Sequence, residues 1–227
     1  MSFALDNGPS TPKIVGVICT QADLRRAARM RNPPDLFELR LDAMCGRNQE
    51  VRDAIGELRA PLIITARHPR EGGSNQLSCQ KRRTLLRRFL PHATYVDIEL
   101  RSAAALTVII DKARAKGIRI IISFHDFNET PGRARLDEIA CAAQSLGAYC
   151  LKIATRTDTS AQLASLLEFY QRERLKMKIA AMGIGYLGMA ARRELFRRGS
   201  ILNYAHLGRT TIAGQPSVSG IRHWRKT

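Results

Sequence analysis

The sequence predicts one α/β domain, a closed (β/α)8 barrel, on two observations. Short runs rich in β-branched residues alternate with longer segments whose apolar residues recur at helical spacing, as in Leu163, Leu166, Leu167 and Tyr170. Eight such strand-like runs follow one another, each separated from the next by a helix-sized segment, which indicates parallel strands buried on both faces. Eight units of this kind are typical of a closed barrel.

The elements can be assigned in order. The expected strands are 14–20, 36–42, 61–67, 94–100, 118–126, 148–155, 177–183 and 201–205. The expected helices are 21–31, 49–59, 76–90, 102–116, 133–146, 159–173 and 189–198. Only 216–227 remain for an eighth helix, which is therefore expected to be short. An open doubly wound sheet is the alternative, but it would normally carry a glycine-rich loop after its first strand, where this chain has CTQADL.

The chain of 227 residues suits a single domain. We expect residues 1–227 to form this one barrel, with 1–12 as a loose N-terminal extension. Hydrophobic residues make up 44%, which is enough for a core, and no apolar run approaches the roughly 18 residues of a membrane span. The N-terminus lacks the pattern of a signal peptide, so a cytoplasmic protein that does not contact membranes is expected.

The charge is strongly positive, with 37 Lys and Arg against 20 Asp and Glu and a formal net charge of +17. Such an excess can mark a nucleic-acid-binding protein. Here, however, the arginines are spread over helix-like segments, aromatic residues are only 6%, and no nucleic-acid motif occurs. We therefore expect no specific nucleic-acid partner.

The five cysteines do not form a recognisable ligand or disulfide pattern. They are Cys19, Cys45, Cys79, Cys141 and Cys150. Their number is odd and none lies in a C-x-x-C pair, which argues against a disulfide framework and a structural zinc site. Free thiols and no bound metal are expected.

Charged residues gather where the predicted strands end, which is where barrel enzymes carry out chemistry. Glu38, Arg40 and Asp42 alternate along the second strand and so share its inward face. Charges inside a barrel are costly unless they are paired or used. Arg67 ends the third strand, and Glu71 lies in the loop that follows it. Asp97 and Glu99 share a face of the fourth strand.

Lys152 is the most informative single residue, because it lies within a strand between Leu151 and Ile153. Burial near other cations lowers the pKa of a lysine. The free amine could then attack a ketone and form a Schiff base. The alternative is a structural ion pair with Asp97 or Glu99 in the barrel core.

His125 ends the neighbouring fifth strand and is placed to move protons near pH 7. Glu71 could orient its imidazole. The alternative is a core histidine whose ring is satisfied by the backbone. Arg40, Arg67 and Arg192 are candidates for an anion site, since a guanidinium binds carboxylates in bidentate fashion, although any one arginine among so many could equally lie on the surface. The loop 210–216 is either a lid or a surface turn.

Seven short motifs occur in order at these strand ends and loops: ELRLD, TAR followed by EGG, DIEL, SFHDF, LKIA, AMG followed by G-x-x-A-R, and AGQPSV. Together they resemble type I 3-dehydroquinate dehydratase of the shikimate pathway, from the first strand to about Val218. The resemblance implies a (β/α)8 barrel, usually a homodimer, that uses no metal or cofactor. It implies a lyase that dehydrates 3-dehydroquinate to 3-dehydroshikimate through a lysine Schiff base.

The resemblance also assigns roles to particular residues. Lys152 resembles the Schiff-base lysine, His125 the general acid/base, and Glu71 the carboxylate paired with that histidine. The substrate-binding residues that it implies are Glu38, Arg40 and Arg67 for the ring hydroxyls, Arg192 for the carboxylate, and Thr211 and Gln215 in the lid.

Three departures from the family pattern accompany the resemblance. The family usually has serine at Thr211. It usually has serine before the carboxylate-binding arginine, where this chain has Ala191, so that arginine could be Arg193 instead. The last helix is also short. Two rival functions stay open: another Schiff-base barrel, such as an aldolase of small keto acids, or a basic nucleic-acid-binding barrel that has lost catalysis. A biosynthetic role and a role in quinate breakdown also stay open.

Overall fold

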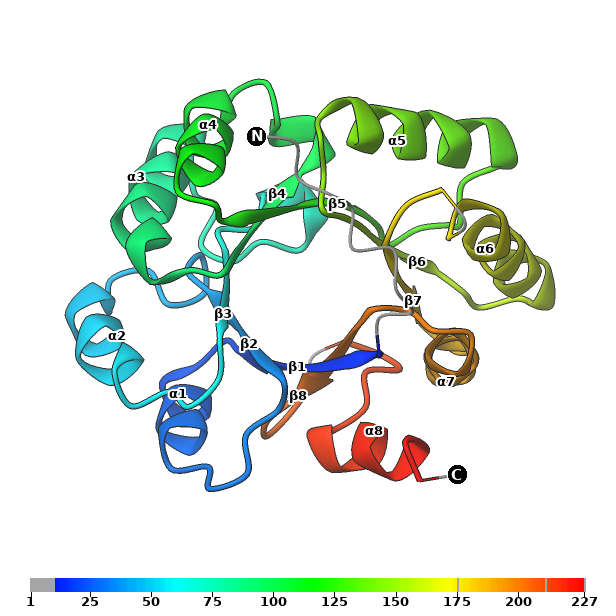
Figure 1. The fold of residues 1–227 in the computed structure, drawn as a ribbon. Helices are drawn as coiled ribbons and strands as arrows, with labels where there is room; N and C mark the ends of the chain where they lie inside the picture. The colour runs from blue at the N-terminus through cyan, green and yellow to red at the C-terminus, as the bar shows by residue number, and fades with distance from the viewer. Residues whose placement is uncertain (1–10, 175, 211, 227) are drawn as a thin grey trace.

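The structure is a computed structural model that describes residues 11–174, 176–210 and 212–226 (Figure 1). Of the expected N-terminal extension, only residues 11 and 12 fall within this part of the chain. Thr211, the predicted lid residue, lies outside the described residues. None of the described helices is both long enough and apolar enough to span a membrane.

Eight parallel strands form the sheet. They are β1 (Lys13–Ile18), β2 (Leu36–Arg40), β3 (Leu62–Thr65), β4 (Tyr95–Glu99), β5 (Arg119–Asp126), β6 (Cys150–Arg156), β7 (Ile179–Ile184) and β8 (Leu202–His206). Neighbours pair in the order β7-β6-β5-β4-β3-β2-β1-β8. At the seam between β7 and β8 the Ile201 amide donates to the Ile179 carbonyl at 3.1 Å. The strands therefore form the expected (β/α)8 barrel, nearly closed, with helices around its outside (Figure 1).

The helices follow the strands along the chain. They are α1 (Gln21–Ala28), α2 (Asn48–Ile55), α3 (Cys79–Phe89), α4 (Thr107–Ala115), α5 (Arg133–Ser145), α6 (Ser160–Glu173), α7 (Gly188–Arg197) and α8 (Val218–Trp224). Three short 3-10 turns are added: η1 (Pro69–Glu71), η2 (Leu90–His92) and η3 (Leu100–Ser102). The fourth helix begins five residues later than expected, because Ser102 belongs to η3 and residues 103–106 form turns before α4.

The eighth helix is short, as the sequence predicts, yet it is well anchored. The Ser217 side chain caps its first turn by accepting from the Gly220 amide at 3.1 Å. The Trp224 ring packs edge-on against Phe196, with ring centroids 5.8 Å apart. Helix α8 therefore covers the seam of the barrel despite its length.

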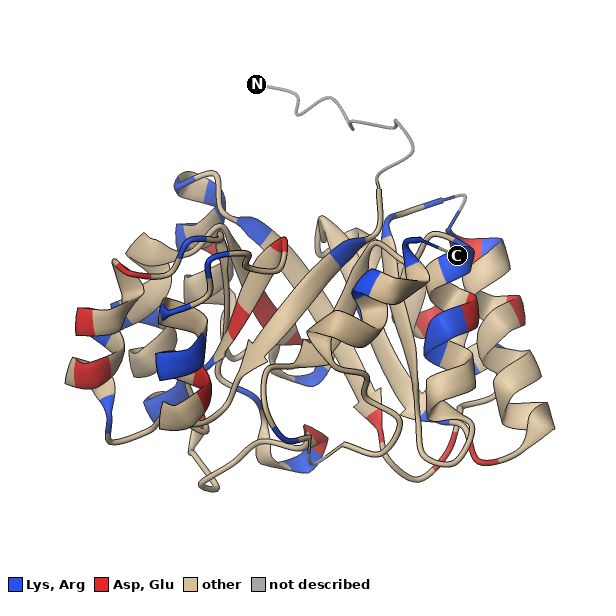
Figure 2. Ribbon diagram, turned by 90° about the horizontal axis from the view of Figure 1, so that it is seen from below, with Lys and Arg blue, Asp and Glu red and all other residues tan. Residues whose placement is uncertain are grey.

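The core has two layers because strand residues alternate between the two faces of the sheet. The larger cluster lies between the strands and the helices and includes Leu39, Ile98 and Leu166. The smaller cluster fills the barrel interior and includes Val15 and Ile121. Figure 2 shows basic positions scattered over the surrounding helices and loops rather than gathered on one element.

Candidate active site

A cavity of about 130 Å³ lies at the carboxyl ends of the strands, within the barrel mouth. Eight of the nine predicted site residues line it; the ninth, Thr211, lies outside the described residues. The eight are Glu38, Arg40, Arg67, Glu71, His125, Lys152, Arg192 and Gln215. The barrel topology thus brings together residues that are spread over almost the whole sequence.

Lys152 is buried in β6 and its ammonium contacts two carboxylates and a ring. Nζ lies 3.0 Å from Asp97 Oδ2, 3.1 Å from Glu38 Oε1 and 3.9 Å above the centroid of the Tyr204 ring. The sequence had suggested a lysine close to other cations, with Asp97 or Glu99 as alternative partners. The immediate partners are the carboxylates of Asp97 and Glu38. Of the two partners considered, Asp97 contacts the ammonium, whereas Glu99 pairs with Arg67 and Arg82 instead.

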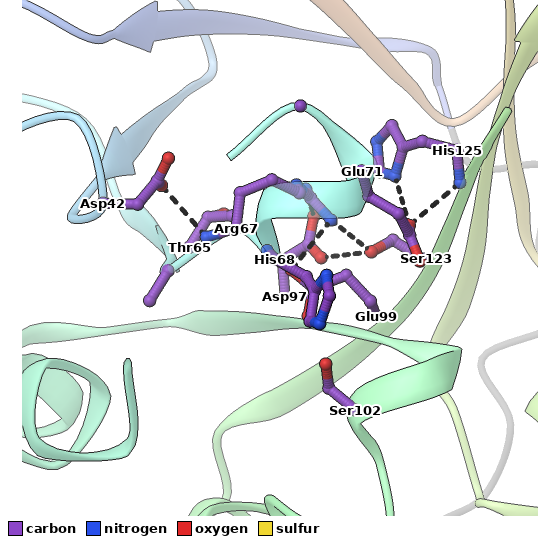
Figure 3. Close-up of polar contacts among 12 residues, drawn as sticks. Asp42, Thr65, Arg67, His68, Glu71, Asp97, Glu99, Ser102, Ser123 and His125 are labelled. Carbon is purple, nitrogen blue, oxygen red and sulfur yellow. Dashed lines mark hydrogen bonds and ion pairs between the residues drawn. The ribbon is translucent and has the colours of Figure 1, made fainter. Parts of the chain in front are cut away.

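Arg67 is fully buried and is bound by protein groups on several sides (Figure 3). Nη2 donates to Asp97 Oδ2 at 2.8 Å, and Nη1 donates to Ser123 Oγ at 2.6 Å and to Glu99 Oε1 at 3.4 Å. Burial alone would lower the pKa of Arg67, but the carboxylates of Asp97 and Glu99 raise it above its usual value. This guanidinium therefore fixes the carboxylates that hold Lys152, and it also reaches the cavity wall.

Glu71 and His125 form a pair beside the lysine. Glu71 Oε2 accepts from the His125 amide at 3.0 Å and lies 3.0 Å from His125 Nδ1 (Figure 3). Burial raises the pKa of Glu71 to about 7. Burial, reinforced by the nearby cations Arg67 and Lys152, holds the pKa of His125 well below its usual value. The imidazole is therefore neutral at pH 7. With Nδ1–H assigned to Glu71, Nε2 keeps a free lone pair that can take a proton.

The EGG motif explains how Glu71 reaches this position. Gly72 ends η1 with φ of 81°, a left-handed conformation that favours glycine. A Cβ at Gly73 would lie 2.2 Å from the Arg67 carbonyl oxygen, so this position also requires glycine. The tight turn returns the chain to the barrel mouth and buries the Glu71 carboxylate.

Arg40 defines another wall of the site, and the buried Asp42 holds it in place. The guanidinium of Arg40 binds Asp42 in bidentate fashion, at 3.0 and 2.8 Å, and donates to the Gly72 carbonyl at 2.9 Å. Asp42 lies beyond the end of β2 and also accepts from the Arg67 and Ser74 amides. Arg40 is therefore held in place by the loop that carries Glu71.

Arg192 differs from the other cavity arginines because carbonyl groups are its hydrogen-bond acceptors. It is buried in the middle of α7, where Nε donates to the Gly183 carbonyl at 2.9 Å and Nη1 to the Tyr204 carbonyl at 3.4 Å. Burial lowers its pKa to about 10. Its sequence neighbour Arg193 is exposed and does not line the cavity. Of the two, Arg192 is thus the one able to meet an anion there.

The predicted lid lies against the same region. Gln215 lines the cavity, and its Oε1 accepts from Thr210 Oγ1 at 2.9 Å. A Cβ at Gly214 would lie 2.8 Å from the Gly188 Cα, so the segment packs closely on the start of α7. The loop therefore borders the site.

Several residues that line or border the site were not singled out from the sequence, among them Tyr204, His206, Arg209 and Arg101. Tyr204 lines the cavity on β8, and its buried hydroxyl has no hydrogen-bond partner in the described part of the chain. The inward alternation of β8 could have indicated it. Arg101 forms an ion pair with Glu71, but nothing distinguishes it in sequence from the many other arginines. Within the described residues, no group of three or more His, Cys, Asp or Glu side chains is arranged to hold a metal ion.

The fold and the site define a (β/α)8-barrel enzyme with a lysine, a histidine and several arginines around one cavity. Residues 16–226 match the family model described as type I 3-dehydroquinase, and the chain belongs to that family. It is 32% identical to the 3-dehydroquinate dehydratase of Methanothermobacter thermautotrophicus over 189 residues, which cover 83% of this chain and 82% of the relative. It is 30% identical to the 3-dehydroquinate dehydratase of Methanocaldococcus jannaschii, covering 89% and 91% of the two chains.

A solved structure agrees with these relatives. The type I 3-dehydroquinate dehydratase of Clostridium difficile, crystallised with covalently modified comenic acid, superposes with a TM-score of 0.84. The two chains are 27% identical, and the match covers 96% of this chain and 93% of the other.

Proposed function

We propose that this chain dehydrates 3-dehydroquinate to 3-dehydroshikimate and water through an imine on Lys152, with His125 as general acid and base. The observation that carries this proposal is a buried lysine in a cavity that also holds a histidine oriented by a carboxylate. Membership of the type I 3-dehydroquinase family supports the overall reaction.

The first step joins the ketone carbon of the substrate to Lys152 Nζ and releases the carbonyl oxygen as water. Because an ammonium cannot attack, Lys152 first gives a proton to a neighbouring base, and His125 moves protons during the condensation. The resulting iminium carries the same charge as the ammonium. Asp97 and Glu38 can therefore stabilise its charge, and the single N–H that the iminium retains can donate to one of them.

The second step removes a proton from the carbon next to the iminium. His125 Nε2 takes this proton, and the C–H electrons move into the imine to give an enamine. The enamine then expels the hydroxyl group on the next carbon, which leaves as water with the proton that His125 returns. Hydrolysis of the conjugated iminium restores the lysine and releases the enone product.

The remaining cavity residues suit substrate binding. Arg192, which lacks a carboxylate partner among the described residues, would bind the substrate carboxylate. Arg40 and Glu38 offer donors and acceptors to the ring hydroxyls, and Gln215 closes the site from the lid. Holding the ring in one orientation converts a difficult proton abstraction into an intramolecular step.

The experiment is a steady-state assay that follows the ultraviolet absorbance of the conjugated product. We expect turnover by the wild type, no detectable turnover by Lys152→Ala, and a loss of roughly 10²–10⁴-fold for His125→Ala. Lys178→Ala is the control, because Lys178 contacts the Tyr149 ring outside the cavity. Wild-type protein that leaves 3-dehydroquinate unchanged but cleaves a keto acid would favour the rival aldolase. Salt-sensitive nucleic-acid binding without turnover would favour the basic binding protein.

The assembly and location belong to the same proposal. The family resemblance leads us to expect a homodimer, and the N-terminal sequence leads us to expect a cytoplasmic location. Sedimentation of the purified chain tests the first, and fractionation of cells tests the second.

A further inference from the structure

Arg101 reaches the catalytic pair from outside the cavity. It follows β4 in η3, and its Nε lies 3.3 Å from Glu71 Oε1. The other oxygen of the same carboxylate, Oε2, faces His125. One carboxylate thus divides its two oxygens between an arginine and the imidazole. The Arg101 side chain is 44% exposed, whereas that of Glu71 is 3% exposed.

The charged groups that face Glu71 come from four elements. They are Arg67 after β3, Glu99 on β4, Arg101 in η3 and His125 on β5. Arg67 is already bound to Asp97 and Glu99. Arg101, in contrast, has its ion pair with Glu71 itself, which is its acidic partner within the described residues.

We propose that Arg101 is a positioning residue that favours the ionised form of Glu71 and keeps it turned toward His125, and so sets the acid limit of the reaction. This inference rests on the proposed role of His125 as general acid and base. An ionised Glu71 accepts Nδ1–H and leaves Nε2 free to take the substrate proton. A protonated Glu71 would no longer hold the imidazole in that tautomer.

The direction of the effect follows from the charges. Burial raises the pKa of Glu71 to about 7, and Arg67 and Arg101 oppose that rise. Removing the Arg101 cation takes away part of the opposition, so Glu71 becomes protonated at a higher pH. Because Arg101 is partly exposed, its effect is modest, about half a pH unit, and salt weakens it.

The experiment measures kcat and KM for 3-dehydroquinate against pH in the full chain. The variants are Arg101→Gln, Arg101→Glu and Arg101→Lys. The control is Arg88→Gln, since Arg88 is an exposed arginine of α3 at a distance from the cavity. Each protein is assayed at about 0.05 M and about 0.5 M salt, and its melting temperature is recorded.

We expect the acid limb of kcat to move up by about half a unit in Arg101→Gln and about one unit in Arg101→Glu, and to return in Arg101→Lys. The plateau at higher pH should stay close to the wild type, and high salt should move the wild type toward Arg101→Gln. A purely structural role would instead lower kcat at every pH together with the melting temperature.

Acid limbs that superpose in wild type, Arg101→Gln and Arg101→Glu would overturn the inference. So would an equal displacement in Arg88→Gln, which would indicate a general effect of net charge. Either result with an active wild type leaves the proposed function intact. Failure of the wild type to dehydrate the substrate would instead overturn the proposed function itself.

Discussion

Lys152 Nζ lies 3.0 Å from Asp97 Oδ2, and the same carboxylate oxygen accepts from Arg67 at 2.8 Å. One anion thus joins the candidate nucleophile to a fully buried guanidinium. An ammonium and an iminium carry the same positive charge, so either would be paired with the Asp97 carboxylate. The buried ion cluster is therefore compatible with the resting state and with the covalent intermediate of the proposed reaction.

The first prediction concerns this anion. Asp97→Asn should destabilise the protein by about 3–5 kcal/mol at pH 7, because it leaves two buried cations short of a partner. Burial alone would raise the pKa of Asp97, but Arg67 and Lys152 hold it well below its usual value. The ionised Asp97 carboxylate therefore stabilises the folded protein in full above the unfolded pKa of about 3.8. This contribution to the free energy of unfolding is lost as the pH falls further.

Urea unfolding at pH values from neutral to about 3 checks this prediction. The gap in stability between wild type and Asp97→Asn should narrow at the acid end. Asp53→Asn on α2 is the control, because that carboxylate is exposed and should change little. A gap that stays constant down to the lowest pH would contradict the account.

The second prediction concerns Glu71. Burial raises the pKa of Glu71 from 4.5 to about 7. The folded protein therefore binds this proton more tightly than the unfolded chain does. Stability is therefore lost as the pH rises through this window. Glu71→Gln has no carboxyl group to ionise. Relative to wild type, its free energy of unfolding should therefore rise by up to about 3 kcal/mol between pH 5 and pH 8, reduced by any loss from weaker hydrogen bonds. Its kcat should fall about 10–100-fold.

Denaturant curves at the two pH values, together with kcat, test this trade between stability and activity. A variant that is equally stable relative to wild type at both pH values would show that Glu71 does not titrate in this range. Retention of full kcat would show that Glu71 is not needed to orient His125.

The third prediction compares adjacent arginines. Burial lowers the pKa of Arg192 to about 10, so keeping it charged at neutral pH costs stability. Arg192→Met should therefore unfold at the same or higher denaturant concentration, while KM rises about 10–100-fold through loss of the carboxylate contact. Exposed Arg193→Met should leave KM unchanged. The opposite ranking of the two variants in KM would place the anion site at Arg193.

The fourth prediction concerns Tyr204. Its ring covers the Lys152 ammonium, but its buried hydroxyl lacks a partner among the described residues. Tyr204→Phe keeps the ring and should be neutral or stabilising by about 1 kcal/mol. Tyr170→Phe is the matched control, because that hydroxyl donates to the Arg198 carbonyl at 3.2 Å and its loss should destabilise by a similar amount. Denaturant unfolding of the two variants in parallel compares their free energies of unfolding. A larger loss of stability for Tyr204→Phe than for Tyr170→Phe would show that the Tyr204 hydroxyl does have a hydrogen-bond partner.

The barrel could be predicted from the sequence because each strand is a short β-branched run that is buried on both faces. Boundaries were less accurate where local turns intervene. The start of α4 was placed too early, since Ser102 ends a separate 3-10 turn and residues 103–106 form turns before the helix begins. The short final helix was foreseen from chain length alone.

The residues that gather at the site could also be predicted, as could the contact between Glu71 and His125, but most of the other contacts could not. Asp97 and Glu38 reach Lys152 from β4 and β2, and only the register of distant strands decides that Glu99 turns instead to Arg67 and Arg82. Nor does sequence decide which of two adjacent arginines faces the cavity. That depends on the rotation of α7 against the barrel.

Covalent trapping at Lys152 tests the central claim most directly. Borohydride added during turnover of 3-dehydroquinate should reduce the imine to a stable amine, and the peptide that contains Lys152 should gain the corresponding mass. The adduct should be absent from Lys152→Ala and from protein treated without substrate, and it should still form, more slowly, in His125→Ala. An active enzyme whose Lys152 peptide gains no mass under these conditions would contradict the account.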